Sequence, residues 1–147
     1  MKTTITELYK RELDRLYTEI DSYIEEDSLW KLADHISNSG GNLCLHLIGN
    51  LHHFIGKYIG NTDYVRHREA EFDTKNTPKA TLLTEIKTVQ KTVVSSLTQL
   101  QEEDLAKNYP IEKNGEIVTI GHMLLHLFWH LSYHIGQINY HRRLLDQ

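Results

Sequence analysis

The sequence predicts an all-α protein, a four-helix bundle that residues 1–147 form as a single domain. Four segments place apolar residues at steps of three and four, which is the period of amphipathic helices. Only two prolines interrupt the 147 residues. A chain of this length can also bury a core without disulfides. These three observations together favour four helices packed around one core.

The first predicted helix covers residues 4–24, where acidic and basic side chains separate apolar residues at helical spacing. An acidic run follows at residues 25–27. Trp30, Leu32 and Ile36 then predict a short turn, and residues 37–41 (Ser-Asn-Ser-Gly-Gly) have the composition of a loop.

The second predicted helix covers residues 43–59 and is apolar around most of its circumference, so we expect it to be buried. Asn42 is the expected N-cap, and Gly60 is expected to take the left-handed conformation that ends many helices. Residues 61–77 are polar and have no sustained period. A connection of this length is expected to be a crossover or a functional loop.

The third predicted helix runs from Pro78 to about Leu100, with Thr77 as its N-cap and the proline in the first turn. Between residues 101 and 118, the Asn114-Gly115 pair predicts a small hairpin. Thr119 is the expected N-cap of a final helix over residues 120–145. The sequence therefore predicts four long helices.

Composition excludes several classes of function. Lys and Arg number 16 against 20 Asp and Glu, a net charge of −4, which argues against nucleic acid as a partner. No run of 18 apolar residues occurs, so no membrane span is expected. The N-terminus lacks the apolar stretch of a secretory signal, and a single cysteine, Cys44, cannot form an internal disulfide. We therefore expect a cytoplasmic protein.

Histidine is the unusual residue of the composition, with ten in the chain. His122, His126, His130 and His134 are spaced four apart on the last predicted helix and share one face. The apolar residues of that helix cluster nearest His130 and His134, which predicts that this later pair points inward. Two histidines four apart can bind one metal ion.

A third ligand could come from the second predicted helix, which contains His46, His52 and His53. His46 lies among leucines, where an unpaired imidazole costs free energy and therefore calls for a metal or a hydrogen-bond partner. His53 is the weaker candidate. The alternative is that His130 and His134 are core-edge residues hydrogen-bonded to neighbouring side chains. Three histidine ligands would leave a coordination position open, as in catalytic sites.

Other metal motifs do not fit. The residue after His130 is Leu131, whereas the HExxH motif of zinc proteases requires glutamate there. The paired Glu-x-x-His sequences of di-iron bundles are also absent. Cys44 is interpreted as a buried free thiol and not as a ligand. A site for a single metal ion remains.

At these residues the chain resembles the DinB/YfiT-like superfamily of metalloenzymes. The resemblance rests on residues 45–51 (LHLIGNL) and on residues 130–137 (HLSYHIGQ), which match the family's HxxxHxGQ element, and it covers nearly the whole chain. It implies four helices in up-up-down-down order that bind one divalent ion, zinc or nickel, through three histidines. These map onto His46, His130 and His134. Members with assigned activity transfer small thiols or catalyse related hydrolysis and isomerisation.

The first functional hypothesis is a metal-dependent enzyme whose three-histidine site activates a thiol or water, as a small-thiol S-transferase or a hydrolase. Its substrate would be a small molecule, with a low-molecular-weight thiol as the candidate. One alternative is a non-enzymatic metal-binding bundle of a stress response, and another is a structural helical dimer with an empty site. No catalytic residue is assigned. The candidates for a general base are His53, His126, Glu69 and Glu71.

Five further features of the sequence have expected roles. Gly136 is expected to let a neighbouring helix approach, and Tyr133 to pack. Gln137 either orients a ligand or makes an ordinary hydrogen bond between helices. Residues 64–72 either gate the site, bind an anionic cosubstrate or form a solvated loop. The aromatic residues Phe128, Trp129 and Tyr140 extend the apolar character of the last helix, which favours a homodimer.

Overall fold

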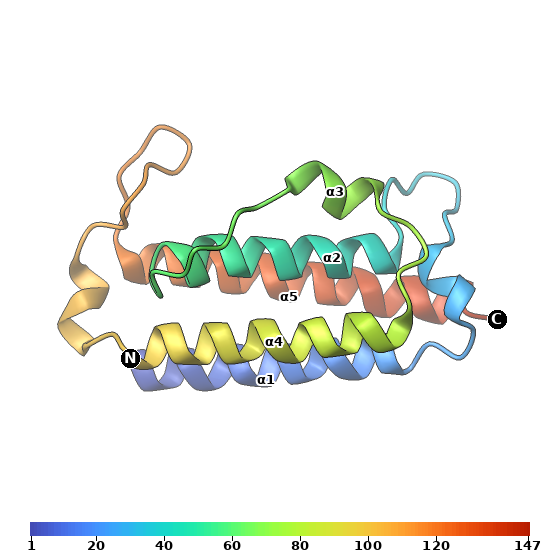
Figure 1. The fold of residues 1–147 in the computed structure, drawn as a ribbon, viewed down its shortest axis with the longest axis horizontal. Coiled ribbons are helices and arrows are strands. Elements are labelled where there is room, and N and C mark those ends of the chain that lie inside the picture. Colours follow the sequence, from blue (N-terminus) through green and yellow to red (C-terminus); the bar gives the residue numbers. More distant parts are fainter.

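A computed structural model describes residues 1–147 and contains four long helices (Figure 1). They are α1 (Lys2–Asp21), α2 (Gly40–Leu51), α4 (Lys79–Thr98) and α5 (Ile120–Leu145). Shorter helical turns lie between them: η1 (Glu26–Trp30), η2 (His52–Lys57), α3 (Arg68–Asp73) and η3 (Glu102–Ala106). The only β pairing consists of two isolated bridges. The predicted all-α four-helix bundle is confirmed.

The four long helices pack around one continuous cluster of buried apolar side chains, to which each of them contributes. In Figure 1, α2 and α5 form one layer and α1 and α4 the other. Tyr9 of α1 is fully buried between helices, and its hydroxyl donates a hydrogen bond to the Leu124 carbonyl of α5. Burial of this cluster is the main force that holds the bundle together.

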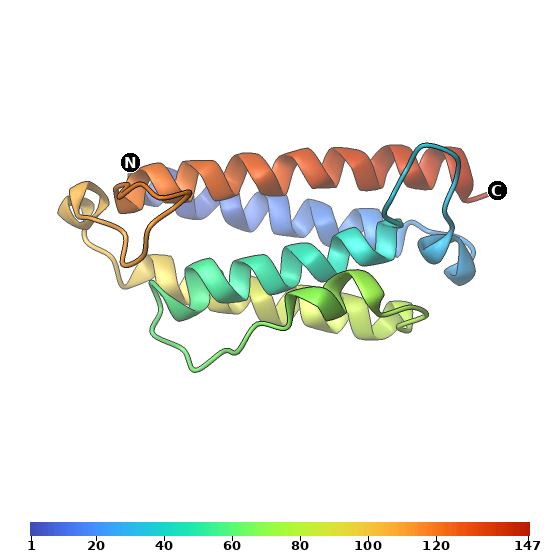
Figure 2. The ribbon, with the colours of Figure 1, turned by 90° about the horizontal axis from the view of Figure 1, so that it is seen from above.

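The helices run in the order up-down-down-up, and the expected up-up-down-down order is wrong. The amide of Ile24, just after α1, donates to Asp146 at the end of α5, so α1 and α5 run parallel. Lys79 at the start of α4 donates to the Asp21 carbonyl at the end of α1, so these two helices are antiparallel. The ribbon agrees from two directions (Figures 1 and 2).

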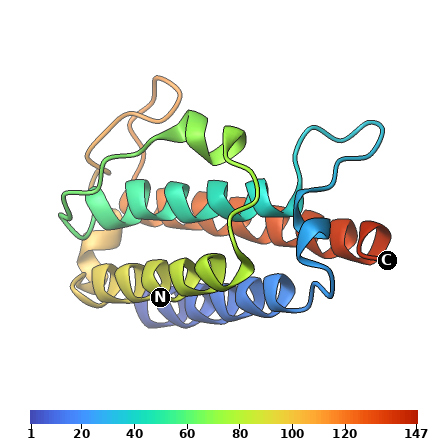
Figure 3. The same cartoon turned by 45° about the vertical axis from the view of Figure 1, so that its right-hand side comes forward.

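The reason for this order lies in the two long connections. Residues 22–39 leave α1 and return at the same end of the bundle, where Trp30 packs against Gly41 at the start of α2. Residues 58–78 instead carry the chain back along the length of the bundle, so α2 and α4 are parallel. This second connection lies across α2 and includes α3 (Figure 3). The predicted crossover is therefore present, and it is partly helical.

The start of α2 differs from the prediction. Ser39 is the N-cap, and its hydroxyl accepts a hydrogen bond from the Asn42 amide at 3.2 Å. Asn42 lies inside the helix, where its side-chain amide donates to the carbonyls of Glu71 (3.0 Å) and Thr74 (2.8 Å). The predicted cap residue therefore fastens the crossover to α2 instead of ending the helix.

The end of the second helix also differs. After Leu51 the chain continues as the π-helical turn η2, a form that often occurs at functional sites. The left-handed residue is Asn61, with φ of 56°, and not Gly60. A Cβ atom at Gly60 would lie 2.1 Å from the Ser96 hydroxyl, so glycine is required there by close packing against α4.

The second half of the chain follows the prediction more closely. Pro78 is the N-cap of α4, one residue later than expected, and no side chain caps this helix. The predicted hairpin is present, with φ of 51° at Asn114 and 79° at Gly115, the conformation that an Asn-Gly turn favours. Thr119 caps α5 by accepting from the His122 amide at 3.1 Å, as predicted.

The outer face of α5 carries exposed aromatic residues. Trp129 is 61% exposed and Tyr140 is 64% exposed, whereas Phe128 packs edge-on against the buried Tyr9. A homodimer through this face stays a prediction. No helix of the structure combines the length and the apolar character that crossing a membrane would require.

Candidate metal centre

Three histidines from two helices converge at the middle of the bundle. His46 comes from α2, and His130 and His134 come from α5. The Nε2 atom of His130 lies 3.1 Å from Nε2 of His46 and 3.1 Å from Nε2 of His134. One ligand atom from each of the three residues lies within 4.8 Å of the others. The structure thus brings together the three residues that the sequence singled out.

A carboxylate fixes the orientation of His46. Its Nδ1 lies 3.0 Å from Glu71 Oε1. Because a carboxylate only accepts hydrogen bonds, Nδ1 carries the proton and the Nε2 lone pair faces the other two imidazoles. Arg66 donates two hydrogen bonds to the same carboxylate, at 2.9 and 3.0 Å. Burial raises the pKa of Glu71, but the hydrogen bonds from His46 and Arg66 outweigh it and leave this pKa lowered.

Glycine makes the contact with Glu71 possible. A Cβ atom at Gly49 would lie 2.0 Å from Glu71 Oε2, so any side chain there would displace the carboxylate. Gly136, in contrast, has no atom within 4 Å of such a position. The expectation that Gly136 lets a helix approach is therefore wrong, and the close approach occurs at Gly49.

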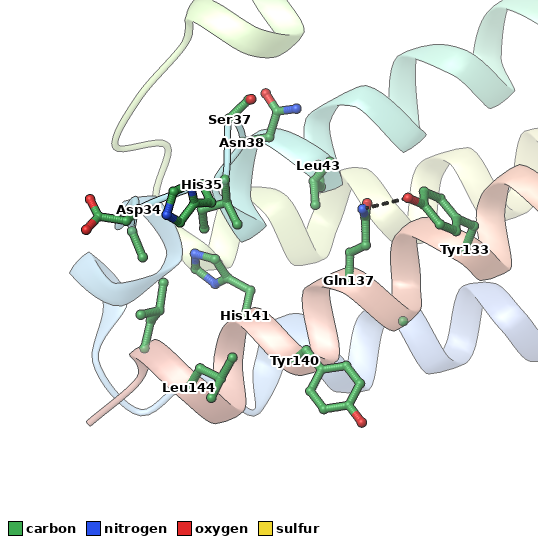
Figure 4. Close-up of a pocket in the computed structure, with 14 residues that line it drawn as sticks. Asp34, His35, Ser37, Asn38, Leu43, Tyr133, Gln137, Tyr140, His141 and Leu144 are labelled. Atoms are coloured by element: carbon green, nitrogen blue, oxygen red, sulfur yellow. Dashed lines mark hydrogen bonds between the residues drawn. The ribbon is translucent and has the colours of Figure 1, made fainter.

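An amide fixes the orientation of His134. Its Nδ1 lies 2.7 Å from Gln137 Oε1, and the Gln137 amide nitrogen donates to the Tyr133 hydroxyl at 3.1 Å (Figure 4). Nδ1 of His134 therefore donates to the amide oxygen, and its Nε2 lone pair also faces the centre. Tyr133 is 53% exposed; its ring stacks on that of Trp129, which agrees with the expected packing role, and its hydroxyl also supports Gln137.

His130 is the least satisfied of the three imidazoles. Its Nδ1 is buried and has no hydrogen-bond partner. Its Nε2 faces two nitrogens that both present lone pairs. Burial, followed by the neighbouring His134 and His46, lowers the pKa of His130 to about 3. Burial also lowers the pKa of His134. Both imidazoles are neutral at neutral pH, which is the form that binds metals.

This donor set fits a divalent cation. Two nitrogens that each lie about 2.0–2.1 Å from a tetrahedral ion are about 3.3 Å apart, close to the 3.1 Å of the two pairs that share His130. A protein hydrogen bond can satisfy only one of these two contacts, because a neutral His130 carries a single proton. A cation at the centre would satisfy all three lone pairs at once.

The crossover contains residues that contact the three histidines and that the sequence did not reveal as neighbours of them. Glu71 was a candidate base in a solvated loop, yet it is only 7% exposed, and α3 holds it over α2. Phe72 lies beside it, with its ring centroid 4.9 Å from that of His46. Because the segment has no hydrophobic period, no local signal could reveal that Arg66, Glu71 and Phe72 face the histidines.

A cavity of about 370 Å³ opens onto the centre on one side. His46 and His130 form part of its wall, and Asn50, Arg66, Arg68, Lys113 and His126 line it as well. The predicted hairpin forms the outer wall, held in place by the Tyr109 hydroxyl, which donates to the Phe54 carbonyl at 2.7 Å. Its volume is suited to a small molecule.

A second, larger cavity of about 720 Å³ lies further along α5 (Figure 4). Its wall includes Tyr133 and Gln137, the two residues that support His134, and also His141 and Leu43. The small cavity meets α5 at residues 123–130 and includes His130, whereas the larger one meets α5 at residues 133–145 and is lined by none of the three histidines.

The other candidate residues lie outside the centre. His53 packs against Phe54 and Tyr58, away from the three histidines. Glu69 is exposed on α3. Cys44 is buried as expected, and burial raises the pKa of its thiol. Of the candidate bases, only His126 lines the small cavity without a carboxylate or guanidinium partner.

Comparisons with known proteins agree with this fold. The search of curated proteins found no match. Among solved structures, the chain is similar to a DinB-like protein from Bacillus cereus ATCC 10987, with a TM-score of 0.70 and 16% identity over 90% of this chain and 84% of the other. The fold is therefore DinB-like. Residues 3–147 match the family model described as "Protein of unknown function (DUF1572)". With its match over nearly the entire length, the chain belongs to the DUF1572 family.

Proposed function

We propose that the protein is a metal-dependent enzyme that transfers a small thiol, with His46, His130 and His134 as ligands of one divalent cation, zinc or nickel. The observation that carries this proposal is the convergence of three Nε2 atoms. In His46 and His134 the other ring nitrogen, Nδ1, makes the hydrogen bond, so Nε2 is free to bind an ion. A site that only fixed two helices together would not need a cavity at its open side.

When bound, such an ion acts as a Lewis acid that favours the deprotonated form of a thiol or of water. The chain itself orients the ligands. Glu71 holds His46 through Nδ1, and Gln137 holds His134 in the same way. Outer partners of this kind fix the tautomer and the ring direction of metal-binding histidines.

His126 is the residue proposed to move the proton. It lies one helical turn before His130 and lines the same cavity. Burial, with a smaller contribution from Lys113, lowers the pKa of His126, so its imidazole is neutral at neutral pH and can accept a proton. In the proposed reaction it takes the thiol proton. The sulfur then bonds to an electrophilic carbon of the second substrate, whose leaving group departs with the bonding electrons and receives that proton.

Thiol transfer is favoured over hydrolysis by two observations. First, Glu71 is the carboxylate hydrogen-bonded to a histidine of the centre, and its oxygens are already occupied by His46 and Arg66, so it is not free to activate water. Second, besides the cavity that His46 and His130 line, a further cavity lies along α5 beside Tyr133 and Gln137, the two residues that support His134. A transfer reaction needs room for two substrates.

Elemental analysis of protein purified without a histidine tag tests the metal site. We expect about one zinc or nickel ion per chain in the wild type and none in His46→Ala or His130→Ala. His122→Ala is the matched control, because His122 is exposed on the same helix and should leave the metal content unchanged. A wild type that stays metal-free after loading would overturn the proposal.

Activity is tested by a screen of small thiols against electrophiles, read as loss of free thiol and formation of the thioether by mass spectrometry. The metal-loaded wild type should accelerate the reaction, and His126→Ala should retain the metal but lose most of the rate, by about 10²–10⁴-fold. A protein that binds metal but accelerates no thiol transfer would instead fit the non-enzymatic metal-binding bundle.

A further inference from the structure

The small cavity beside the three histidines has more cationic than anionic side chains in its wall, although the chain as a whole is acidic. Arg66, Arg68 and Lys113 line it together with one carboxylate, the exposed Glu112. Because Arg66 is paired with Glu71, the cationic excess comes from Arg68 and Lys113. The whole chain carries a formal charge of −4. Cations concentrated in one concave site of an acidic protein attract an anion to that site.

The cations come from two separate segments and face one space. Arg66 and Arg68 belong to the crossover, and Lys113 belongs to the hairpin that forms the outer wall. Arg66 is held in place, because it is bonded to Glu71 through Nε and one Nη2 proton and lies over the Phe54 ring. A guanidinium has five N–H donors, so the remaining donors of Arg66 are not used by Glu71.

Asn50 gives an independent sign that a ligand is missing from this cavity. Its side chain is only 6% exposed, yet it makes no hydrogen bond, and its Oδ1 atom is buried without a partner. It lies one helical turn after His46 and forms part of the cavity wall. A buried amide without partners costs free energy, which a bound polar molecule would offset.

We propose that this cavity binds the oxyanion group, a carboxylate or a phosphate, of the small molecule on which the enzyme acts. Arg68 and Lys113 hold the anion, Arg66 contributes its unused donors, and Asn50 bonds a polar group of the same molecule beside His46. This inference rests on the proposed function, because it treats the three histidines as the reacting centre. It adds the chemical class of the substrate.

The arrangement also sets the distance between the anion and the centre. The Arg68 guanidinium lies 5.2 Å from the centroid of the Phe72 ring, which in turn lies 4.9 Å from the His46 ring. An anion held by Arg68 therefore sits within the length of a small organic molecule from His46. The group next to the anion would reach the centre, and Asn50 would align it.

A titration of the chelator-treated protein with inorganic phosphate, at constant ionic strength, tests this directly. Nitrogen-15 NMR follows the side-chain signals of Asn50, Arg66 and Arg68. We expect saturable shifts at these three residues and affinity at least about tenfold weaker in an Arg68→Gln/Lys113→Gln double variant, equivalent to about 1.4 kcal/mol. Arg11→Gln, which removes an exposed cation from α1, should bind as the wild type does. A parallel titration with succinate identifies which oxyanion binds more tightly.

The two proposals fail in different ways. If neither phosphate nor succinate binds, or if the double variant binds them as strongly as the wild type does, the anion subsite is overturned even if the protein binds its metal. Metal content is measured on the same samples, and the double variant should hold as much metal as the wild type because neither residue is a ligand. A protein that binds phosphate in the cavity but no metal would keep the subsite and overturn the proposed enzyme.

Discussion

Two histidines of α5, His141 and His130, differ in what surrounds them. His141 has both ring nitrogens satisfied by the protein, with Nδ1 2.7 Å from the Tyr23 hydroxyl and Nε2 2.9 Å from the Lys31 carbonyl. His130, 11 residues earlier, has a buried Nδ1 without a partner and an Nε2 that faces two other imidazoles. The sequence alone does not separate these two residues.

The difference shows how a structural histidine and a candidate metal ligand can be told apart. The carbonyl of Lys31 only accepts, so Nε2 of His141 donates and its Nδ1 accepts from Tyr23; a neutral ring is then complete. At His130, in contrast, Nε2 meets two other nitrogens that present lone pairs, and Nδ1 has no partner in the protein. An unsatisfied buried polar group is therefore the stronger evidence of function.

The largest expected effect is stabilisation by metal. With free zinc at 1,000 times the dissociation constant, the wild type should gain about 4 kcal/mol in free energy of unfolding. His141→Phe should gain the same amount, and His130→Phe none. Urea unfolding with and without zinc measures both. A gain in His130→Phe equal to that of the wild type would show that zinc binds elsewhere.

Without metal, His141→Phe should lose more stability than His130→Phe. His141→Phe removes the partners of the Tyr23 hydroxyl and the Lys31 carbonyl, which should cost about 1–3 kcal/mol of stability. His130→Phe should cost less, because it removes an imidazole whose Nδ1 had no partner. Urea unfolding of chelator-treated protein compares them. An equal loss at both sites would contradict the distinction drawn between them.

The next largest effect is expected from changing Glu71, the carboxylate that orients His46. Glu71→Gln keeps an acceptor for His46 but removes the charge that Arg66 binds, and metal affinity should fall by about 10–100-fold. Competition with a chelating dye measures the affinity. Glu69→Gln, on the exposed side of α3, is the matched control and should bind metal as the wild type does.

Glu71 also shows which part of the site could not be predicted from the sequence. His46, His130 and His134 could be predicted because regular helices convert spacing into direction. Glu71 could not, since it lies on a crossover whose path depends on Asn42 holding the carbonyls of Glu71 and Thr74. The helix order failed for a related reason: residues 22–39 carry no periodic signal that reveals where the chain turns back.

The lowered pKa of His130 predicts how this residue changes stability with pH. In the metal-free protein its pKa is lowered to about 3, whereas in the unfolded chain it returns to about 6.5. Between these values the unfolded state binds more protons, so His130 makes stability fall as pH drops below about 6.5, by up to about 1.4 kcal/mol per pH unit. The stability of His130→Phe relative to the wild type should therefore rise from pH 7 to pH 5 in urea unfolding. A difference that stays constant would contradict the burial of a neutral His130.

The smallest effect is expected when a glycine of either helix that carries the three histidines is replaced by alanine. Gly136→Ala meets no atom within 4 Å and should stabilise α5 by up to about 1 kcal/mol, because alanine favours a helix more than glycine does. Gly49→Ala gains the same helix propensity, but its Cβ would lie 2.0 Å from Glu71 Oε2 and must push the carboxylate away. That variant should lose both stability and metal affinity, as chemical unfolding and dye competition would reveal. If Gly49→Ala instead bound metal normally, the contact between Glu71 and His46 would not be what orients the ligand.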